Sequence, residues 1–185
     1  MSTRPRATSL ADLRAQFAQI TSRVSTLFGT MDAARFTTRP TPQSWSAAEC
    51  LAHLNLSVDP YFAAWADALA RAPRAETDRY TLDLWGRLLV WTLEPPPRFR
   101  VPTSANFQPV RIEHPDTVVP AFVSRQEAIL RTIDAARGVA IDKIKIVSPF
   151  ERRVRYSIWS SFCVTAAHER RHLWQAERAA GVSPG

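Results

Sequence analysis

The sequence predicts an all-α protein, a four-helix bundle with a short extra helix and a Pro-rich insertion. Apolar residues recur at steps of three and four along four long stretches, which is the spacing of amphipathic helices. Gly is scarce, at 5 residues, whereas the 14 Pro cluster between these stretches. With 185 residues, 45% of them hydrophobic, the chain is long enough to bury the core of one domain. Four such helices joined by loops favour a bundle.

The first helix begins at Ser9, after a polar N-terminus (residues 1–8) that we expect to be flexible; residues 9–181 form the predicted single domain. Ser9 and Asp12 have the spacing of a capping pair. Gly29 lies near the expected end of the helix, and Pro40 and Pro42 exclude helix beyond it. The apolar stripe of this helix consists of Leu10, Leu13, Phe17, Ile20, Val24, Leu27 and Met31.

The second helix opens with Trp45-Ser46-Ala47-Ala48-Glu49, in which Ser46 as N-cap and Glu49 three residues later form a capping box. Its main apolar face consists of Leu51, Leu54, Val58, Phe62, Trp65 and Leu69. An adjacent strip at helical spacing consists of Cys50, His53, Ser57 and Tyr61. We expect Pro60 to kink or locally break this helix, because proline lacks a backbone donor, and residues 63–71 to resume it.

A shorter helix is predicted within the apolar stretch 80–93, and the run Glu94-Pro95-Pro96-Pro97 ends it. The following residues, 98–116, contain three further prolines and form an extended insertion. Long ordered insertions in compact domains are often functional, so we expect this segment to cover an open end of the bundle.

The third long helix is predicted over residues 118–137, with Gly138 as its C-terminal stop. Residues 141–147 are interpreted as an extended connector. The fourth helix is predicted over residues 155–180 and is closed by Gly181 and Pro184. One of its faces carries Ile158, Ser161, Phe162, Thr165, His168 and His172, and another carries Trp159, Cys163, Ala166, Leu173 and Trp174.

His168 and His172 are the chemically informative pair of the fourth helix. Residues four apart lie on one helical face, so two neutral imidazoles can reach one metal ion from adjacent turns. A third ligand has to come from a facing helix, and His53 is the best candidate. His114 fits no ligand spacing and is left out. The alternative is that these histidines are ordinary surface residues, because an H-x3-H pair also arises by chance.

A resemblance to the DinB-like superfamily rests on two motifs. Its W-S-x-x-E-x-x-x-H-L motif is matched by Trp45-Ser46-Ala47-Ala48-Glu49-Cys50-Leu51-Ala52-His53-Leu54. Its final-helix H-x3-H, especially in the DinB_2 subgroup, is matched by His168-Glu169-Arg170-Arg171-His172-Leu173-Trp174-Gln175. The segment Leu93-Glu94-Pro95-Pro96-Pro97 is also similar to DinB_2 members, and the resemblance extends over residues 10–180.

The resemblance implies a four-helix bundle, frequent homodimers and a metal site formed by His53, His168 and His172, commonly with nickel or zinc. Characterised relatives include transferases and isomerases that use low-molecular-weight thiols. The implied function is therefore metal-dependent transfer of such a thiol to an electrophilic small-molecule substrate, or hydrolysis. A metal ion with an open position lowers the pKa of a bound thiol or water, so no protein nucleophile is required. No catalytic residue and no organic cofactor are assigned.

Three polar residues near the predicted ligands are given no catalytic role. Cys50 lies one turn before His53 and could contribute to the pocket, but a buried apolar filler is the simpler interpretation. Glu49 is expected to be occupied as the cap partner. Glu169 points about 100° away from His168 on a helix, so it is not proposed as a base.

One alternative function stays open, and the composition of the chain argues against several others. A non-catalytic metal- or small-ligand-binding bundle stays open as the alternative. Nucleic-acid binding is indicated only by a net charge of +7, and the basic residues are scattered without a Lys/Arg tract, so no nucleic-acid partner is expected. Two cysteines form no disulfide framework, and no apolar run is long enough for a signal peptide or a membrane span. A cytoplasmic protein without a membrane partner is the expectation.

Overall fold

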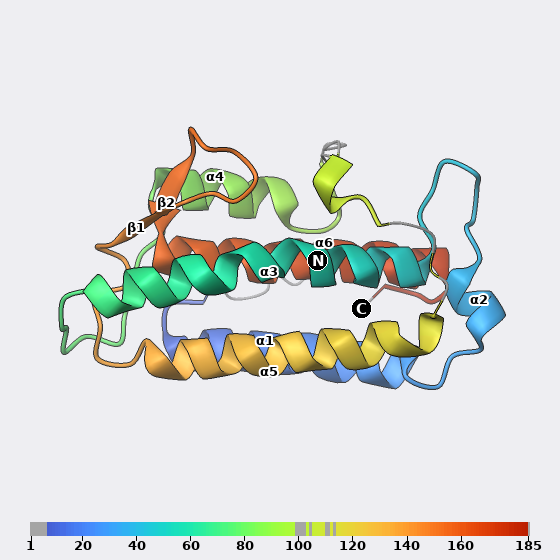
Figure 1. Ribbon diagram of the computed structural model, residues 1–185, viewed down its shortest axis with the longest axis horizontal. Helices are drawn as coiled ribbons and strands as arrows, with labels where there is room; N and C mark the ends of the chain where they lie inside the picture. The colour runs from blue at the N-terminus through green and yellow to red at the C-terminus, as the bar shows by residue number, and fades with distance from the viewer. Residues whose placement is uncertain (1–6, 99–102, 104, 110–111, 113, 185) are drawn as a thin grey trace.

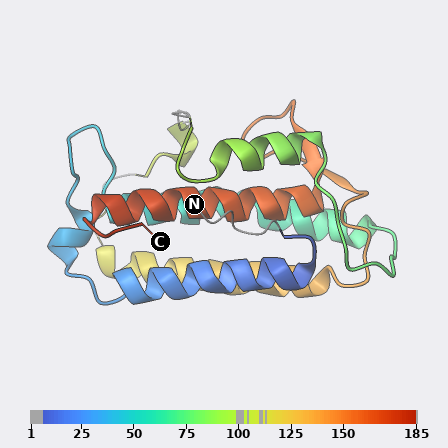
Figure 2. The ribbon, with the colours of Figure 1, turned by 180° about the vertical axis from the view of Figure 1, so that it is seen from behind.

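The computed structural model describes residues 7–98, 103, 105–109, 112 and 114–184, and the predicted all-α bundle is confirmed. Four long helices form it in two layers (Figure 1): α1 (Leu10–Phe28) lies beside α5 (Val118–Ala135), and α3 (Ala47–Arg71) lies beside α6 (Ile158–Ala179). The short helix α4 (Leu84–Leu93) packs on the outside of α6, away from α1 and α5 (Figure 2). Within the described part of the chain, no helix is both long and apolar enough to cross a membrane.

The predicted helix starts are confirmed by their hydrogen bonds. Ser9 and Asp12 form a capping box at α1, and Ser46 and Glu49 form one at α3. At each cap, a side chain accepts from a backbone N–H that the helix itself leaves unpaired. Gly138 and Gly181, which follow α5 and α6, adopt φ values of 69° and 67°, a left-handed conformation that glycine tolerates without strain.

Two features of the first half differ from the prediction. No helix was expected beyond the first one before Trp45, because Pro40 and Pro42 exclude it, but a short helix, α2 (Ala33–Thr37), lies ahead of these prolines, with Asp32 as its N-cap. It buries Phe36 against Phe28, and this aromatic contact helps to stabilise a helix that would be too short to form alone. Helix α3 runs through Pro60 without a break, because the helix on either side is held by buried side chains.

The connection to α6 also differs. Residues 141–147 were expected to form an extended connector, and residue 155 was expected to begin the fourth helix. Instead, Lys145–Val147 (β1) and Arg155–Ser157 (β2) pair as a small antiparallel sheet, called the hairpin below. Helix α6 therefore begins at Ile158, with Ser157 as its N-cap. The sheet buries Ile146 and Tyr156 against the bundle, and this burial stabilises the two strands. Each strand is too short to show the alternation of apolar and polar residues that would predict it from sequence.

The remaining boundaries are smaller corrections. The helix predicted within residues 80–93 begins at Leu84, after Asp83, which accepts from the backbone N–H of Gly86. Asp83 also accepts from the N–H of Ser157, so one carboxylate links the starts of α4 and α6. In the insertion, two short 3₁₀ turns are described, Ala105–Phe107 (η1) and Pro115–Thr117 (η2). The prediction that residues 98–116 cover an end of the bundle falls partly outside the described residues, as does most of the expected flexible N-terminus.

The core is divided into two apolar clusters along the length of the bundle. One contains Phe17, Trp65, Ile129 and Phe162 and lies towards the hairpin, and the other contains Val24, Leu51, Phe122 and Leu173 and lies towards α2. Helices α3 and α6 run antiparallel (Figure 1), so the capped start of α3 faces the C-terminal half of α6. That level of the bundle carries the polar residues described next.

Candidate metal centre

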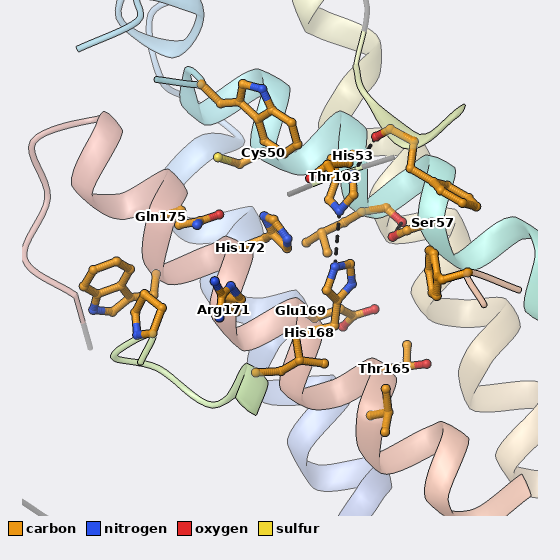
Figure 3. Close-up of a pocket in the computed structure, with 18 of the residues that line it drawn as sticks. Cys50, His53, Ser57, Thr103, Thr165, His168, Glu169, Arg171, His172 and Gln175 are labelled. Atoms are coloured by element: carbon orange, nitrogen blue, oxygen red, sulfur yellow. Dashed lines mark hydrogen bonds between the residues drawn. The ribbon is translucent and has the colours of Figure 1, made fainter. Parts of the chain in front are cut away.

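The three predicted ligand residues meet between α3 and α6. His53 comes from α3 and His168 and His172 from α6, and one ring nitrogen of each lies within 4.8 Å of the others. The ring centroids are 4.4 to 5.1 Å apart, and all three rings point into the same space (Figure 3). These residues could together hold one metal ion. His114, which was left out of the predicted site, is exposed and does not belong to this group.

Local sequence explains why these side chains converge. His168 and His172 are four residues apart and therefore occupy adjacent turns of one face of α6. The capping box fixes the start of α3, and His53 follows four residues after Glu49, in the second turn of the helix. Arg39 pairs with Glu49, so that the capping carboxylate is held on both sides. Burial alone would raise the pKa of Glu49, but its bonds to Arg39 and to the Ser46 N–H lower it overall.

His53 has a fixed tautomer. Its Nδ1 lies 2.7 Å from the backbone carbonyl oxygen of Phe107, which can only accept, so Nδ1 carries the proton and donates. The Nε2 lone pair of His53, on the opposite side of the ring, then faces His168 Nε2 and could bind a metal ion in its place. Orientation of a metal-binding imidazole by a carbonyl on its other nitrogen is a common arrangement of metal sites. The carbonyl comes from η1, in the predicted insertion.

The other nitrogens also fit a metal ion. His53 Nε2 and His168 Nε2 are 3.2 Å apart, close to the separation of about 3.4 Å between two nitrogens bound tetrahedrally to zinc. His172 Nδ1 is buried and has no hydrogen-bond partner among the residues described. A buried nitrogen without a partner is costly, and a ligand that accepts its lone pair or its proton would remove that cost.

Burial keeps the three imidazoles neutral. It lowers the pKa of His53, and it lowers that of His168 to about 3, with further contributions from His53 and from the Arg171 guanidinium. Burial, with further contributions from His168, His53 and Arg171, holds the pKa of His172 well below its usual range. Neutral imidazole is the form that binds a metal ion, so the site requires no deprotonation near pH 7.

A cavity of about 1290 Å³ opens beside the histidines. Apolar and aromatic side chains make most of its wall, including Trp45, whose ring lies 5.1 Å from that of His53 and 5.9 Å from that of His172. Leu89 and Leu93 of α4 and Phe150 and Tyr156 of the hairpin line the wall nearer the hairpin. Polar and charged side chains, among them Arg171 and Gln175, form the rest of the wall, and a concave pocket of this kind is typical of small-molecule sites.

Cys50 and Glu169 line the same cavity. Burial raises the pKa of the Cys50 thiol to about 12, so this cysteine is no nucleophile at neutral pH, and the apolar interpretation holds. Glu169 was set aside because it points away from His168. It is nevertheless buried at the edge of the cavity, where Gln126 of α5 donates to its Oε1, and burial raises its pKa to about 8.

Sequence reasoning missed the parts of the site that come from outside the helices. The Phe107 carbonyl has no side-chain signature, since any residue supplies one. Trp45 was recognised only as part of the helix start, although its place one residue before the cap could have indicated an aromatic wall. Phe150 and Tyr156 depend on a hairpin that was interpreted as connector and helix.

Comparisons with known proteins agree with this geometry. The family model of the DinB superfamily, DinB_2, matches residues 16–176, which include all three histidines and the four long helices almost entirely. Searches among curated proteins and among solved structures return no significant match. Because the family model covers most of the chain, this protein belongs to the DinB superfamily.

Proposed function

We propose that this protein is a metal-dependent enzyme that transfers a low-molecular-weight thiol to an electrophilic small molecule, with His53, His168 and His172 as ligands of a divalent ion, nickel or zinc. The observation that carries the proposal is the position of three neutral imidazoles at the wall of a large, mostly apolar cavity. When bound, the ion supplies positive charge and an open coordination position, which lowers the pKa of a thiol or of water.

An open position is supported by the donor set. Among the described residues, no Cys, Asp or Glu joins the three histidines as a fourth donor. A structural site usually has four protein ligands, whereas a catalytic site keeps one position for water or substrate. The Cys50 thiol, the nearest candidate by sequence, is not part of the group of side chains whose ligand atoms converge.

The residues around the triad provide orientation and shelter from water. The Phe107 carbonyl fixes the His53 tautomer, and the ring of Trp45 covers His53 and His172. In the proposed reaction, the thiol sulfur forms a bond to the electrophilic carbon, the leaving group departs with the bonding electron pair, and the thiol proton passes to solvent. The apolar wall would hold the electrophile against the sulfur.

The first test is metal content. Protein purified without an affinity tag or chelator should contain about one nickel or zinc ion per chain by elemental analysis. The double variant His53→Ala, His168→Ala should contain almost none, whereas His114→Ala, which removes an exposed histidine elsewhere, should be unaffected. Equal metal content in the double variant would overturn the ligand assignment.

The second test is turnover. A panel of low-molecular-weight thiols is incubated with monochlorobimane, and conjugation is followed by fluorescence with wild type and with the double variant. Metal-dependent acceleration with at least one thiol supports the proposal. If no thiol reacts faster with the metal-loaded protein, the non-catalytic alternative, a metal- or small-ligand-binding bundle, is favoured.

We also propose a cytoplasmic homodimer. The outward face of α4 exposes four large apolar side chains, Leu84, Trp85, Leu88 and Trp91, and exposed apolar patches of this kind often mark protein interfaces. Light scattering should give twice the monomer mass, and Leu88→Glu should reduce it to the monomer mass. The cytoplasmic location is supported by Cys50 and Cys163, which are both buried free thiols.

A further inference from the structure

Thr165 is oriented differently from other helical threonines in this chain. Four others donate their hydroxyl to the carbonyl four residues earlier in the same helix, at 2.8 to 2.9 Å; they are Thr21, Thr37, Thr92 and Thr132. This local bond is the usual way for a threonine inside a helix to satisfy its hydroxyl. Thr165 is only 5% exposed, and its Oγ1 has no hydrogen-bond partner in the described part of the chain.

A second unpartnered atom lies one turn further along α6. Glu169 is 2% exposed, and its Oε1 accepts from Gln126, but its Oε2 has no partner within the described ranges. Thr165 and Glu169 are four residues apart, so they occupy adjacent turns of one helical face. Two buried oxygens left unpaired on adjacent turns of one helical face call for a common explanation.

Both residues line the cavity that contains the histidines. In Figure 3, Thr165 and Glu169 lie next to His168 on α6, and Ser57 of α3 lies across from them. Ser57 also lines the cavity and donates to the Leu54 carbonyl, so its oxygen can still accept a hydrogen bond. Thr165, Glu169 and Ser57 thus form a polar cluster in a wall whose surface is mostly apolar, where each hydrogen bond to a ligand contributes to specificity for that ligand.

We propose that Thr165 and Glu169 form a subsite that binds a hydroxyl group of the small molecule held at the histidines. A hydroxyl both donates and accepts, so it can pair with the Thr165 hydroxyl and with Glu169 Oε2 at the same time. An alkyl group in the same place would leave both oxygens unpaired. The substrate class is thus a ligand that carries a hydroxyl within a few bonds of its metal-binding atom.

This subsite rests on the proposed function in one respect, because it assumes that the ligand binds at the three histidines. Successive turns of a helix are about 5.4 Å apart, so a hydroxyl at Thr165 lies roughly one turn from the metal ligands. A linker of two to four carbons between the metal-binding atom and the hydroxyl covers distances of that size.

The test compares matched pairs of probes on the cobalt-substituted protein. Hydroxyalkanethiols of two, three and four carbons are titrated against alkanethiols in which a methyl group replaces the hydroxyl, and each Kd is read from the change in the cobalt absorption spectrum. A second pair, glycolohydroxamic and propionohydroxamic acid, repeats the comparison through an oxygen-binding group. The variants are Thr165→Val, which removes the hydroxyl at nearly constant volume, and Thr132→Val, whose hydroxyl is already paired on α5.

In wild type, the hydroxyl-bearing member of at least one pair should be preferred, and Thr165→Val should reduce that preference about fivefold, the effect of one net hydrogen bond. Thr132→Val should leave it unchanged. If only hydroxamates bind and their preference depends on Thr165, thiol transfer is wrong but the subsite stands. If thiols bind and the preference is the same in Thr165→Val, the subsite is wrong while the proposed function survives. Absence of any Thr165-dependent preference in both series also overturns the subsite.

Discussion

Two polar levels between α3 and α6 are built from the same helical strip but are completed differently. At one level, the histidine layer, His53 of α3 meets His168 and His172 of α6. About two turns along α3, at the tyrosine layer, Tyr61 bonds to Tyr156 at 2.6 Å and Trp65 donates to Ser161 at 2.7 Å. The tyrosine layer therefore pairs its polar atoms within the fold.

The histidine layer and the residues next to it leave several of their buried polar atoms unpaired. Across the described residues, His172 Nδ1, Thr165 Oγ1 and Glu169 Oε2 are buried without partners, and all three residues line the cavity. Polar atoms that serve folding alone are expected to be paired, because an unpaired one costs about 1–3 kcal/mol. In the described part of the chain, Asn55 Oδ1 and Trp159 Nε1 are also buried and unpaired but lie outside the cavity wall, so it is the combination with the cavity that favours a ligand-binding role for the histidine layer.

The largest expected effect is on the tyrosine layer. Trp65 is fully buried, and its ring contacts Tyr61, Phe62 and Phe162. Trp65→Ala should lower the free energy of unfolding by about 3–5 kcal/mol, because it leaves a cavity and removes the donor to Ser161. Chemical denaturation of the metal-free protein measures this. A loss below about 1 kcal/mol would contradict a structural role for this layer.

The next effect concerns metal and the histidine layer. Zinc or nickel at a hundredfold excess over its Kd should raise the free energy of unfolding by about 2.7 kcal/mol, because it binds the folded state, and a chelator should reverse the gain. His172→Leu should abolish the gain, because it removes one of the three proposed ligands. A metal-dependent gain that persists in His172→Leu would place the ion elsewhere.

The third effect is the pH dependence of the metal-free protein. In the fold the pKa of His168 is lowered to about 3, whereas in the unfolded chain the imidazole takes up a proton below its ordinary value of 6.5. The unfolded state thus binds more protons, and stability falls as the pH drops below 6.5. Between pH 6.5 and about pH 5, the loss should be about 1–2 kcal/mol smaller in His168→Gln than in wild type. Identical losses would show that His168 is solvated.

The smallest effect tests the pairing within the tyrosine layer. Tyr61→Phe should cost about 1 kcal/mol, because Tyr156 keeps Ser148 as a second partner when the Tyr61 hydroxyl is removed. A double-mutant cycle with Tyr156→Phe isolates the coupling of the two hydroxyls. Additive losses in the cycle would mean that the two hydroxyls do not depend on each other.

The parts of the site that were predictable are those that obey helical periodicity. His168 and His172 share a face because they are four residues apart, and the capping box at Ser46 fixes where α3 starts and hence where His53 lies. These relations are local, so a sequence contains them directly. The pairing of α3 with α6 is not local, so His53 could be chosen only as the best candidate on a facing helix, and the family resemblance supported that choice.

The parts that were missed depend on contacts far apart in the chain. Strands β1 and β2 have three residues each, too few for alternation to be visible, and they form because Ile146 and Tyr156 are buried against helices. Helix α2 likewise depends on Phe36 meeting Phe28. Glu169 was judged by its angle on the helix alone, but in the structure it lines the cavity together with Thr165.

The bond from His53 to the Phe107 carbonyl has a consequence for how this site can diverge. A backbone carbonyl is present in every amino acid, proline included, so position 107 can change its side chain without losing the acceptor. The insertion can therefore accumulate substitutions, and with them new contacts to different small molecules, while the orientation of the imidazole is retained. What such a lineage cannot change freely is the length of the segment, because an added or lost residue would shift the carbonyl away from the ring.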